Sequence, residues 1–188
     1  MALGWGDEVS RPPRARDKVL DAFEDVLRED GERAATLENV ARRAGVSKGG
    51  LLYHFRTRDA LDVGLLERMQ GLAAADLETM AAAPEGPVHY FLATSGHVGS
   101  PFDRAILAVS RLAHGGNVPA RTALTELRTM WAEAIRPHVR DEAALDLVLL
   151  VSDGLYINTA SLNDVPGPVP TGAALEALIQ LVEGATRE

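Results

Sequence analysis

The stretch GVSKGGLLYHF, residues 45–55, decides how the rest of the chain is read. Its first five residues fit two incompatible patterns. One is G-x-S-x-G, the nucleophile elbow of a hydrolase, in which Ser47 would attack the substrate. The other is the turn and second helix of a helix-turn-helix, in which Ser47 would cap a helix.

The residues before Gly45 argue against the nucleophile elbow. An elbow needs a buried β-strand that leads into the serine. Residues 37–44, LENVARRA, have the period and composition of a helix instead. A catalytic triad also needs an acid and a histidine presented by a sheet, and no segment shows strand alternation bounded by turn residues. We therefore expect an all-α protein, with a helical hydrolase using Ser47 as the alternative.

Residues 36–51 meet the main requirements of a helix-turn-helix. Ala41 is small enough for two helices to cross closely, and Gly45 can adopt a positive φ at the turn without strain. Thr36 and Ser47 are suited to cap the two helices by accepting from free backbone amides. The positions expected to face the first helix of the chain are all apolar: Val40, Ala44, Val46 and Leu51.

A longer segment, residues 36–66, resembles the DNA-binding part of TetR-type transcriptional regulators. That family has a Thr before its second helix, a stretch like I-A-x-x-A-G-V-S-x-G, a His/Tyr-Phe pair, and a basic residue at the start of the fourth helix. This chain has Thr36, Val40-Ala41, Ala44-Gly45-Val46-Ser47, Gly49, Tyr53-His54-Phe55 and Arg58 at those places. The all-helical remainder and the length of 188 residues also suit the family.

The resemblance implies a homodimer that binds double-stranded DNA with its third helix in the major groove. By position, the residues that would meet phosphates or bases are Thr36, Ser47, Lys48, Gly49, Leu52, Tyr53, His54 and Arg58. Phe55 would pack into the core of the small domain. Leu52 stands where the family often has an aromatic residue, so it would either pack inward or touch a thymine methyl.

Gly49 and Gly50 are unusual in a helix of about two turns, because each costs about 0.5–1 kcal/mol relative to Ala. Two explanations are open. Both glycines can lie in the first turn, where the cost is smaller. Alternatively, the helix approaches DNA closely or becomes firm only on binding.

Charge is distributed unevenly along the chain. The net charge is −8, but residues 1–58 hold eleven basic and ten acidic residues, whereas residues 59–188 hold eight and seventeen. Residues 40–58 contain five basic residues and no acidic one. Because exposed charges are screened beyond about 8–10 Å, this local basic patch can meet a phosphate backbone on an otherwise acidic molecule.

Proline- and glycine-containing stretches divide the whole chain into about nine helices. They are expected at residues 13–30, 37–44, 48–55, 58–82, 88–95, 102–114, 120–136, 143–162 and 173–185. The first three helices would form a DNA-binding domain, residues 1–58. The others would form a larger ligand-binding and dimerisation domain, residues 59–188.

The last two predicted helices are rich in apolar residues. Residues 143–162 are apolar nearly all round, which indicates burial on more than one side. We expect a four-helix interface between two copies, with a fully intramolecular core as the rival explanation. The residues predicted to form the interface are Leu147, Val151, Leu155, Leu175, Leu178, Ile179 and Val182.

Candidates for a small-molecule site are sparse. His97, Phe102, Trp131 and Tyr156 could line a partly apolar pocket between helices, with core packing as the alternative for the large residues. His89 and His97 could share a helix face, but no third ligand and no HExxH pattern accompany them. We therefore expect no metal, no cofactor and no catalytic residues, and keep a histidine-based enzyme as part of the alternative.

The remaining sequence features concern location. The chain has no cysteine, which excludes disulfides and thiolate metal sites. It has no signal-peptide core and no run of about eighteen apolar residues, so we expect a soluble cytoplasmic protein without a membrane partner.

Together, these features predict a ligand-responsive, sequence-specific DNA-binding regulator. It would act as a repressor that binds a near-palindromic operator as a dimer and is released by a small molecule. A helical enzyme is the main alternative, and a helical binding module without a DNA role is a minor one.

Overall fold

The computed structural model describes residues 12–97, 99–160 and 167–187, and these contain helices but no strand. The α-helices are α1 (Pro12–Glu29), α2 (Leu37–Ala44), α3 (Lys48–His54), α4 (Arg58–Ala82), α5 (Pro87–Ser95), α6 (Pro101–His114), α7 (Val118–Ile135), α8 (Glu142–Ala160) and α9 (Ala173–Thr186). Two single 3₁₀ turns, η1 (Glu32–Ala34) and η2 (Arg136–His138), were not expected from the sequence. The predicted all-α class is confirmed.

Side-chain caps fix where the early helices begin. The Thr36 hydroxyl accepts from the Asn39 amide at 3.2 Å, and the Ser47 hydroxyl accepts from the Gly50 amide at 3.0 Å. Thr57 caps α4 in the same way, at 3.1 Å from the Ala60 amide. Proline moves some later starts, because α5 and α6 begin on Pro87 and Pro101, one residue before the predicted starts. The predicted end of α8, at residues 161 and 162, lies outside the described residues.

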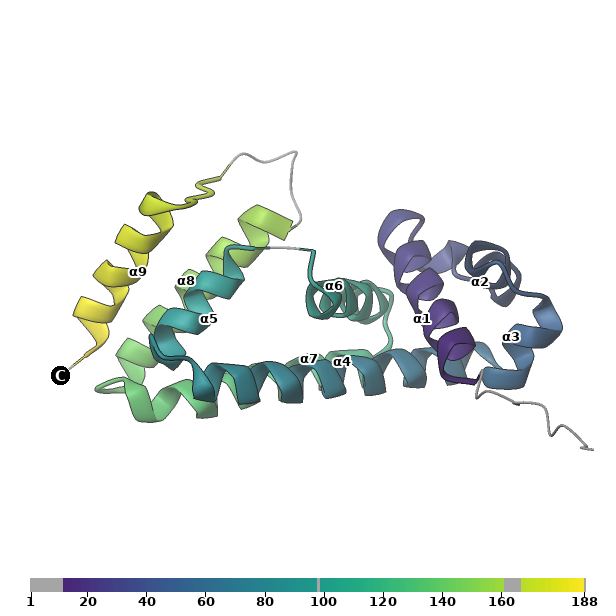
Figure 1. Cartoon of the computed structure of the whole chain (residues 1–188), viewed down its shortest axis with the longest axis horizontal. Coiled ribbons are helices and arrows are strands. Elements are labelled where there is room, and N and C mark those ends of the chain that lie inside the picture. The colour runs from purple at the N-terminus through teal and green to yellow at the C-terminus, as the bar shows by residue number, and fades with distance from the viewer. Residues whose placement is uncertain (1–11, 98, 161–166, 188) are drawn as a thin grey trace, which may run out of the picture.

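The helices are arranged along one long support (Figure 1). Helix α4 runs beneath the molecule, with α7 packed against it. Helices α1, α2 and α3 lie at one end, and α5, α8 and α9 lie at the other. Helix α6 stands between these groups and packs on α1, α4 and α7. Within the described ranges, no helix combines the length and apolar character needed to cross a membrane.

Two apolar clusters hold the molecule together. The first joins the N-terminal helices to α6 and α7 and includes Phe23, Leu61 and Val109. The second lies among α4, α5, α7, α8 and α9. Trp131 packs against both clusters. The proposed domain division between residues 58 and 59 falls at the start of α4, and apolar packing continues across it.

The residues predicted for a dimer interface fall into two groups. Leu155, Leu175, Ile179 and Val182 are buried in the second cluster by contacts within this chain, and a place for them in a dimer interface stays a prediction. An apolar helix face looks the same in sequence whether its own chain or another covers it. Leu147, Val151 and Leu178 are at least partly exposed. Leu150 and Leu181, which the prediction omitted, are 66% and 72% exposed.

Candidate nucleic-acid interface and ligand cavity

Helices α2 and α3 form the helix-turn-helix around a left-handed glycine. Gly45 has φ 67° and ψ 31°, and its amide closes α2 by donating to the Ala41 and Arg42 carbonyls. Val40, Ala41 and Leu51 are fully or almost fully buried below the turn. A helix leads into Ser47, so the strand that a nucleophile elbow requires is replaced by α2. Ser47 acts as the predicted helix cap.

The outer side of α3 exposes polar and aromatic groups. Tyr53 is 80% exposed, and its ring meets that of His54 edge-on at a centroid distance of 5.1 Å. Lys48 forms an ion pair with Glu38, which joins the first turns of α3 and α2 and keeps the two capped helix starts together. We define the recognition surface as Thr36, Ser47, Lys48, Gly49, Leu52, Tyr53 and His54. All seven are exposed or half-buried.

Both unusual glycines lie in the first turn of α3. A Cβ added to Gly50 would sit 3.3 Å from the Ser47 hydroxyl that caps the helix, which is a tight contact. At Gly49 the same atom would be 3.9 Å away. The first-turn explanation therefore fits the structure. A close approach of Gly49 to DNA stays a prediction.

The basic patch contains both paired and unpaired cations. Arg43 bridges Glu29 at 2.6 Å and Asp30 at 3.0 Å, and its guanidinium lowers the pKa of Glu29. Arg42 and Arg56 are exposed and form no ion pair with any described residue. These two arginines were part of the predicted patch but not of the predicted contacts, because exposure cannot be read from the sequence.

Arg58, which was predicted to contact phosphate, makes several contacts within the protein. Its Nε lies 2.9 Å from Asp62, it donates to the Ala35 carbonyl, and its guanidinium lies 4.8 Å from the centroid of the Phe23 ring. The side chain is 28% exposed. These contacts hold the cation at the junction of α1, α2 and α4, and a contact from Arg58 to phosphate stays a prediction.

The contacts of Arg58 continue to α7. The Asn117 side-chain Nδ2 donates to the other oxygen of Asp62 at 3.1 Å, and its side-chain Oδ1 caps α7 by accepting from the Ala120 amide at 2.9 Å. We call Ala35, Arg58, Asp62 and Asn117 the joint network. It connects the start of α7 to the start of α2 through α4.

A second connection links α6 to α1. Glu24 on α1 is only 1% exposed and lies 3.0 Å from Arg68 of α4 and 3.9 Å from Arg104 of α6. Burial raises the pKa of Glu24, and the Arg68 guanidinium opposes that shift. A charged group that is buried in this way ties three helices to one another.

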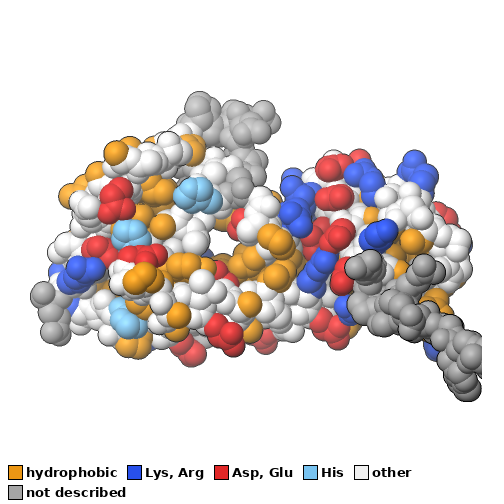
Figure 2. Space-filling model, viewed as in Figure 1, with side chains coloured by type: hydrophobic (Ala, Val, Ile, Leu, Met, Phe, Trp, Pro, Cys, Tyr) orange, Lys and Arg blue, Asp and Glu red, His pale blue; other side chains and the backbone are white. Residues whose placement is uncertain are grey.

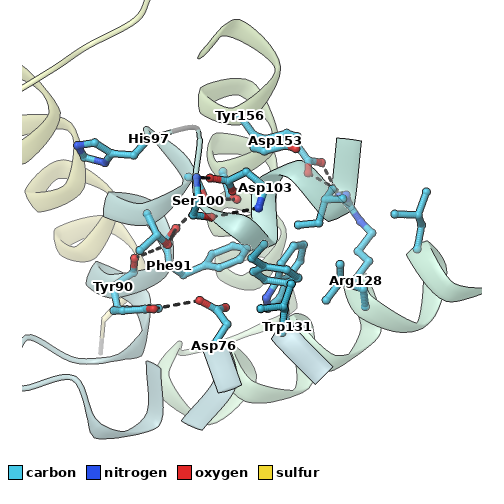
Figure 3. A pocket seen from close by; sticks show the side chains of 18 of the residues that line it. Asp76, Tyr90, Phe91, His97, Ser100, Asp103, Arg128, Trp131, Asp153 and Tyr156 are labelled. Carbon is cyan, nitrogen blue, oxygen red and sulfur yellow. Dashed lines mark hydrogen bonds and ion pairs between the residues drawn. The ribbon is translucent and has the colours of Figure 1, made fainter. Parts of the chain in front are cut away.

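A cavity of about 820 Å³ lies among α4, α5, α6, α7 and α8. All four residues predicted for a ligand site, His97, Phe102, Trp131 and Tyr156, line this cavity. Figure 3 labels three of them, His97, Trp131 and Tyr156. The space-filling view shows the molecule hollowed beside α6, while blue basic side chains gather mainly over the N-terminal helices (Figure 2). The two candidate sites are therefore separate in space and differ in charge.

The cavity also contains polar residues that the sequence-based prediction missed. Asp76, Asp103 and Asp153 line it together with Tyr90 and Arg128. Burial raises the pKa of Asp76 above its ordinary value and that of Tyr90 to about 12. The available signal was that Asp76 shares a face of α4 with Leu72 and Met80, four residues away on either side, where an acid interrupts an apolar stripe.

The two candidate metal histidines do not converge. His89 faces α9, 3.6 Å from Glu176 and 3.9 Å from Glu183. His97 lies at the cavity, with Nδ1 2.7 Å from the Ala93 carbonyl oxygen. In the part of the chain that the structure describes, no group of three potential ligands could hold a metal ion.

Fold and site together define a helix-turn-helix transcription factor with a separate ligand cavity. The family described as "Bacterial regulatory proteins, tetR family" matches residues 19–61, from α1 into α4. The HTH-type transcriptional regulator BetI of Escherichia coli O157:H7 is 27% identical over 177 residues, which cover 85% of this chain and 89% of the relative. BetI of Burkholderia thailandensis is 29% identical over 178 residues, with coverages of 86% and 88%. Residues 19–61 thus carry the DNA-binding segment of the TetR family, and the chain is similar to regulators of that family over most of its length.

Solved structures show the same fold. Salmonella enterica GusR superposes with a TM-score of 0.66 at 16% identity, covering 96% of this chain and 99% of its own. The multidrug binding protein EbrR, complexed with imidazole, superposes with a TM-score of 0.60 at 20% identity, with coverages of 94% and 97%. The family assignment makes this chain a DNA-binding transcription factor rather than an enzyme.

Proposed function

We propose that this chain binds a near-palindromic operator as a homodimer, represses the adjacent gene, and leaves the operator when a small molecule occupies the cavity. The observation that carries the proposal is α3 itself. One side of this short, capped helix is anchored by the buried Leu51, and the other presents Lys48 and an 80% exposed Tyr53. An exposed aromatic residue beside a lysine contributes little to the fold but suits contacts to bases and phosphates.

The proposed DNA contacts are the recognition surface together with Arg42 and Arg56. Surface ion pairs such as Lys48–Glu38 are worth about 0–1 kcal/mol, so phosphates can replace their acidic partners at small cost. The exposed Arg42 and Arg56 have no such partner to leave. Arg58 would instead stabilise the position of the recognition surface through its contacts in the joint network.

The proposed dimer forms through α8 and α9, leaving the recognition surface of each copy at the far end of the molecule. Leu150 and Leu181 are the most exposed apolar residues of these helices, and Leu147, Val151 and Leu178 extend the same apolar character. A second copy would bury them in a four-helix interface. We also propose that residues 1–58 act as the DNA-binding domain and residues 59–188 as the ligand-binding and dimerisation domain, in a protein that works in the cytoplasm.

Release from DNA would follow from the position of α6. This helix contributes Phe102 and Asp103 to the cavity, and the next residue, Arg104, approaches Glu24 of α1. A ligand that binds more tightly to one position of α6 would shift the population toward that conformer and change the spacing of the two recognition surfaces. EbrR, a multidrug binding protein with this fold, supports the use of the fold for small molecules.

Replacing Lys48 and Tyr53 together with Ala tests the proposal. The double variant should lose operator binding in a gel-shift experiment, while its thermal unfolding and its dimer mass stay those of the unmodified protein. Arg121→Ala, an exposed arginine on α7, is the matched control and should bind normally. Unchanged binding by the double variant would contradict the assignment of α3 to the DNA.

A further inference from the structure

Two carboxylates in the cavity have no cationic partner. Asp76 comes from α4 and accepts from the Tyr90 hydroxyl at 3.0 Å, and Asp103 comes from α6 and accepts from the Ser100 amide at 3.0 Å. Neither forms an ion pair with a described residue. Among the described residues that line the cavity, Arg128 is the one Lys or Arg, and its two Nη atoms donate to Asp153 at 2.8 and 2.5 Å.

Asp76 and Asp103 are acids that line one cavity. Burial is the main cause of the raised pKa of Asp76, and repulsion by the negative charge of Asp103 raises it further. A cation bound between them would remove this repulsion and replace the water that burial has taken away. An anion there would add to the repulsion instead.

Aromatic rings surround the same space. Phe91 and Phe102 both pack on Trp131, with centroid distances of 5.4 and 6.0 Å, and Tyr90 and Tyr156 complete the lining. The faces of such rings attract organic cations by about 0.5–2 kcal/mol, and their area accepts apolar groups. The acids and the aromatic rings thus both favour an organic cation.

Two buried donors in the lining lack an acceptor. Trp131 Nε1 and the Tyr156 hydroxyl are inaccessible to solvent and make no hydrogen bond. The indole N–H favours the charged form of Asp76, yet it does not reach hydrogen-bond geometry with that carboxylate. Buried donors are normally satisfied, but neither atom opens onto the cavity, so neither assigns a polar group to the ligand.

The size of the cavity sets the size of the ligand. At about 820 Å³ it lies toward the upper end of the roughly 300–1,000 Å³ range of small-molecule sites. A small ammonium compound would leave most of this space empty. The ligand therefore needs an apolar body of drug-like size in addition to its charge.

We propose that the effector of this regulator is an amphiphilic organic amine. Its protonated nitrogen lies between Asp76 and Asp103, and its apolar body packs on the rings around Trp131. The inference names the ligand class of the proposed effector site, and it rests on the proposed function only in taking this cavity as that site.

Three compounds with a common diphenylmethoxy-ethyl body test the ligand class. One ends in a dimethylamine, which is protonated at neutral pH, one in an isopropyl group of the same shape, and one in a carboxylate. Binding is followed by the fluorescence of Trp131 in a Trp5→Phe chain, which leaves it as the sole tryptophan. The amine should bind about tenfold to a hundredfold more tightly than the isopropyl compound, as for hydrogen bonds to charged groups, and the carboxylate should bind most weakly.

Charge-removing variants locate the amine. Asp76→Asn and Asp103→Asn should each weaken binding of the amine by about tenfold and leave the isopropyl compound unchanged. Asp146→Asn, an exposed acid of α8 outside the cavity, should change neither. Equal affinity for the amine and isopropyl compounds, or no loss in the two cavity variants, would overturn the proposal.

This measurement is independent of the proposed function. Binding is read on the protein without DNA, so a chain that binds no operator can still show the preference for the amine. Conversely, a chain that binds its operator but prefers the isopropyl or carboxylate compound would support the proposed function and overturn the proposal of an amine effector.

Discussion

The recognition surface and the cavity both combine aromatic rings with charged side chains. The charges are positive and exposed at the recognition surface, and they are negative and lie inside the molecule at the cavity. On the recognition surface the ring of Tyr53 is exposed, and the nearby patch residues Arg42 and Arg56 form no ion pair with the residues that the structure describes. In the cavity aromatic rings line the same space as acids, and Asp76 and Asp103 form no ion pair within the described part of the chain. The comparison teaches that the local unpaired charge indicates the partner, whereas the net charge of −8 does not.

Each region also contains one arginine that is already paired with an acid of the same chain. Arg58 is held by Asp62 and the Ala35 carbonyl, and Arg128 is held by Asp153. Both would look available to an anionic ligand in the sequence. The pairing of Arg58 leaves one cation fewer for the proposed DNA contacts. The pairing of Arg128 with Asp153 leaves the cavity with unpaired acids and no unpaired arginine among the described residues that line it.

The largest expected effect is on operator binding, which needs a dimer, whereas binding in the cavity needs only one copy of the chain. Leu150→Glu together with Leu181→Glu should place charges in the proposed α8–α9 interface and convert the dimer to monomers. Operator affinity should then fall by about a hundredfold to ten-thousandfold, because the two half-sites are no longer bound by one particle. Amine binding should persist. Sedimentation and gel-shift experiments measure both, and a double variant that stays dimeric would contradict the proposed interface.

A smaller effect contrasts the two aromatic residues. Trp131→Ala should lower the free energy of unfolding by about 2–4 kcal/mol, because the ring packs against both apolar clusters. Tyr53→Ala should change it by less than about 0.5 kcal/mol, because the ring is exposed, yet it should weaken operator binding. Urea unfolding of the two variants measures the contrast. Equal losses of stability would show that Tyr53 serves the fold.

The joint network should show an intermediate loss. Asp62→Ala removes the shared partner of Arg58 and Asn117, so we expect a loss of about 1–3 kcal/mol in the free energy of unfolding and weaker operator binding. Asp59→Ala, one turn earlier in α4, is the matched control, because Asp59 is exposed. If Asp62→Ala binds the operator as tightly as the control does, the network does not support the recognition surface.

The smallest effect is a pH dependence of opposite sign in the two regions. The raised pKa of Asp76 in the fold means that its favourable contribution is present below the unfolded value of 3.8 and is lost as pH rises through the folded value. The lowered pKa of Glu38, caused by Lys48, gives a contribution that is present above the unfolded value of 4.5 and is lost as pH falls through the folded value. We therefore expect Asp76→Asn to gain stability relative to the unmodified protein as pH rises above 3.8, and Glu38→Gln to lose its disadvantage as pH falls below 4.5. Parallel curves would contradict the assigned causes.

The helix-turn-helix could be predicted almost residue by residue, because its determinants are local. A cap is set by residues within one turn, and the glycine at 45 is needed for one backbone conformation, φ 67°. The helix boundaries followed from the same short-range signals. Gly49 and Gly50 were left with two explanations, and the first-turn position given by the structure follows from the cap at Ser47.

The remaining features depend on contacts between distant segments. Leu155 and Leu150 lie on one helix and are equally apolar, yet the first is 4% exposed and the second 66%, because α5 and α9 cover only one side of α8. Arg58 turns inward because Asp62 and Ala35 happen to lie beside it. The cavity acids come from α4, α6 and α8, and their convergence requires the tertiary fold. The four residues predicted for the ligand site do line one cavity, but whether they bind a ligand stays a prediction.

Selection of bound duplexes from random DNA, with the purified unmodified chain, tests the central claim that α3 reads DNA as one half of a dimer. The account predicts enrichment of a near-palindrome whose half-sites are separated by about one helical turn, and no enrichment with the Lys48→Ala, Tyr53→Ala variant. A pool that stays random, or an enriched site without two-fold symmetry, would contradict it.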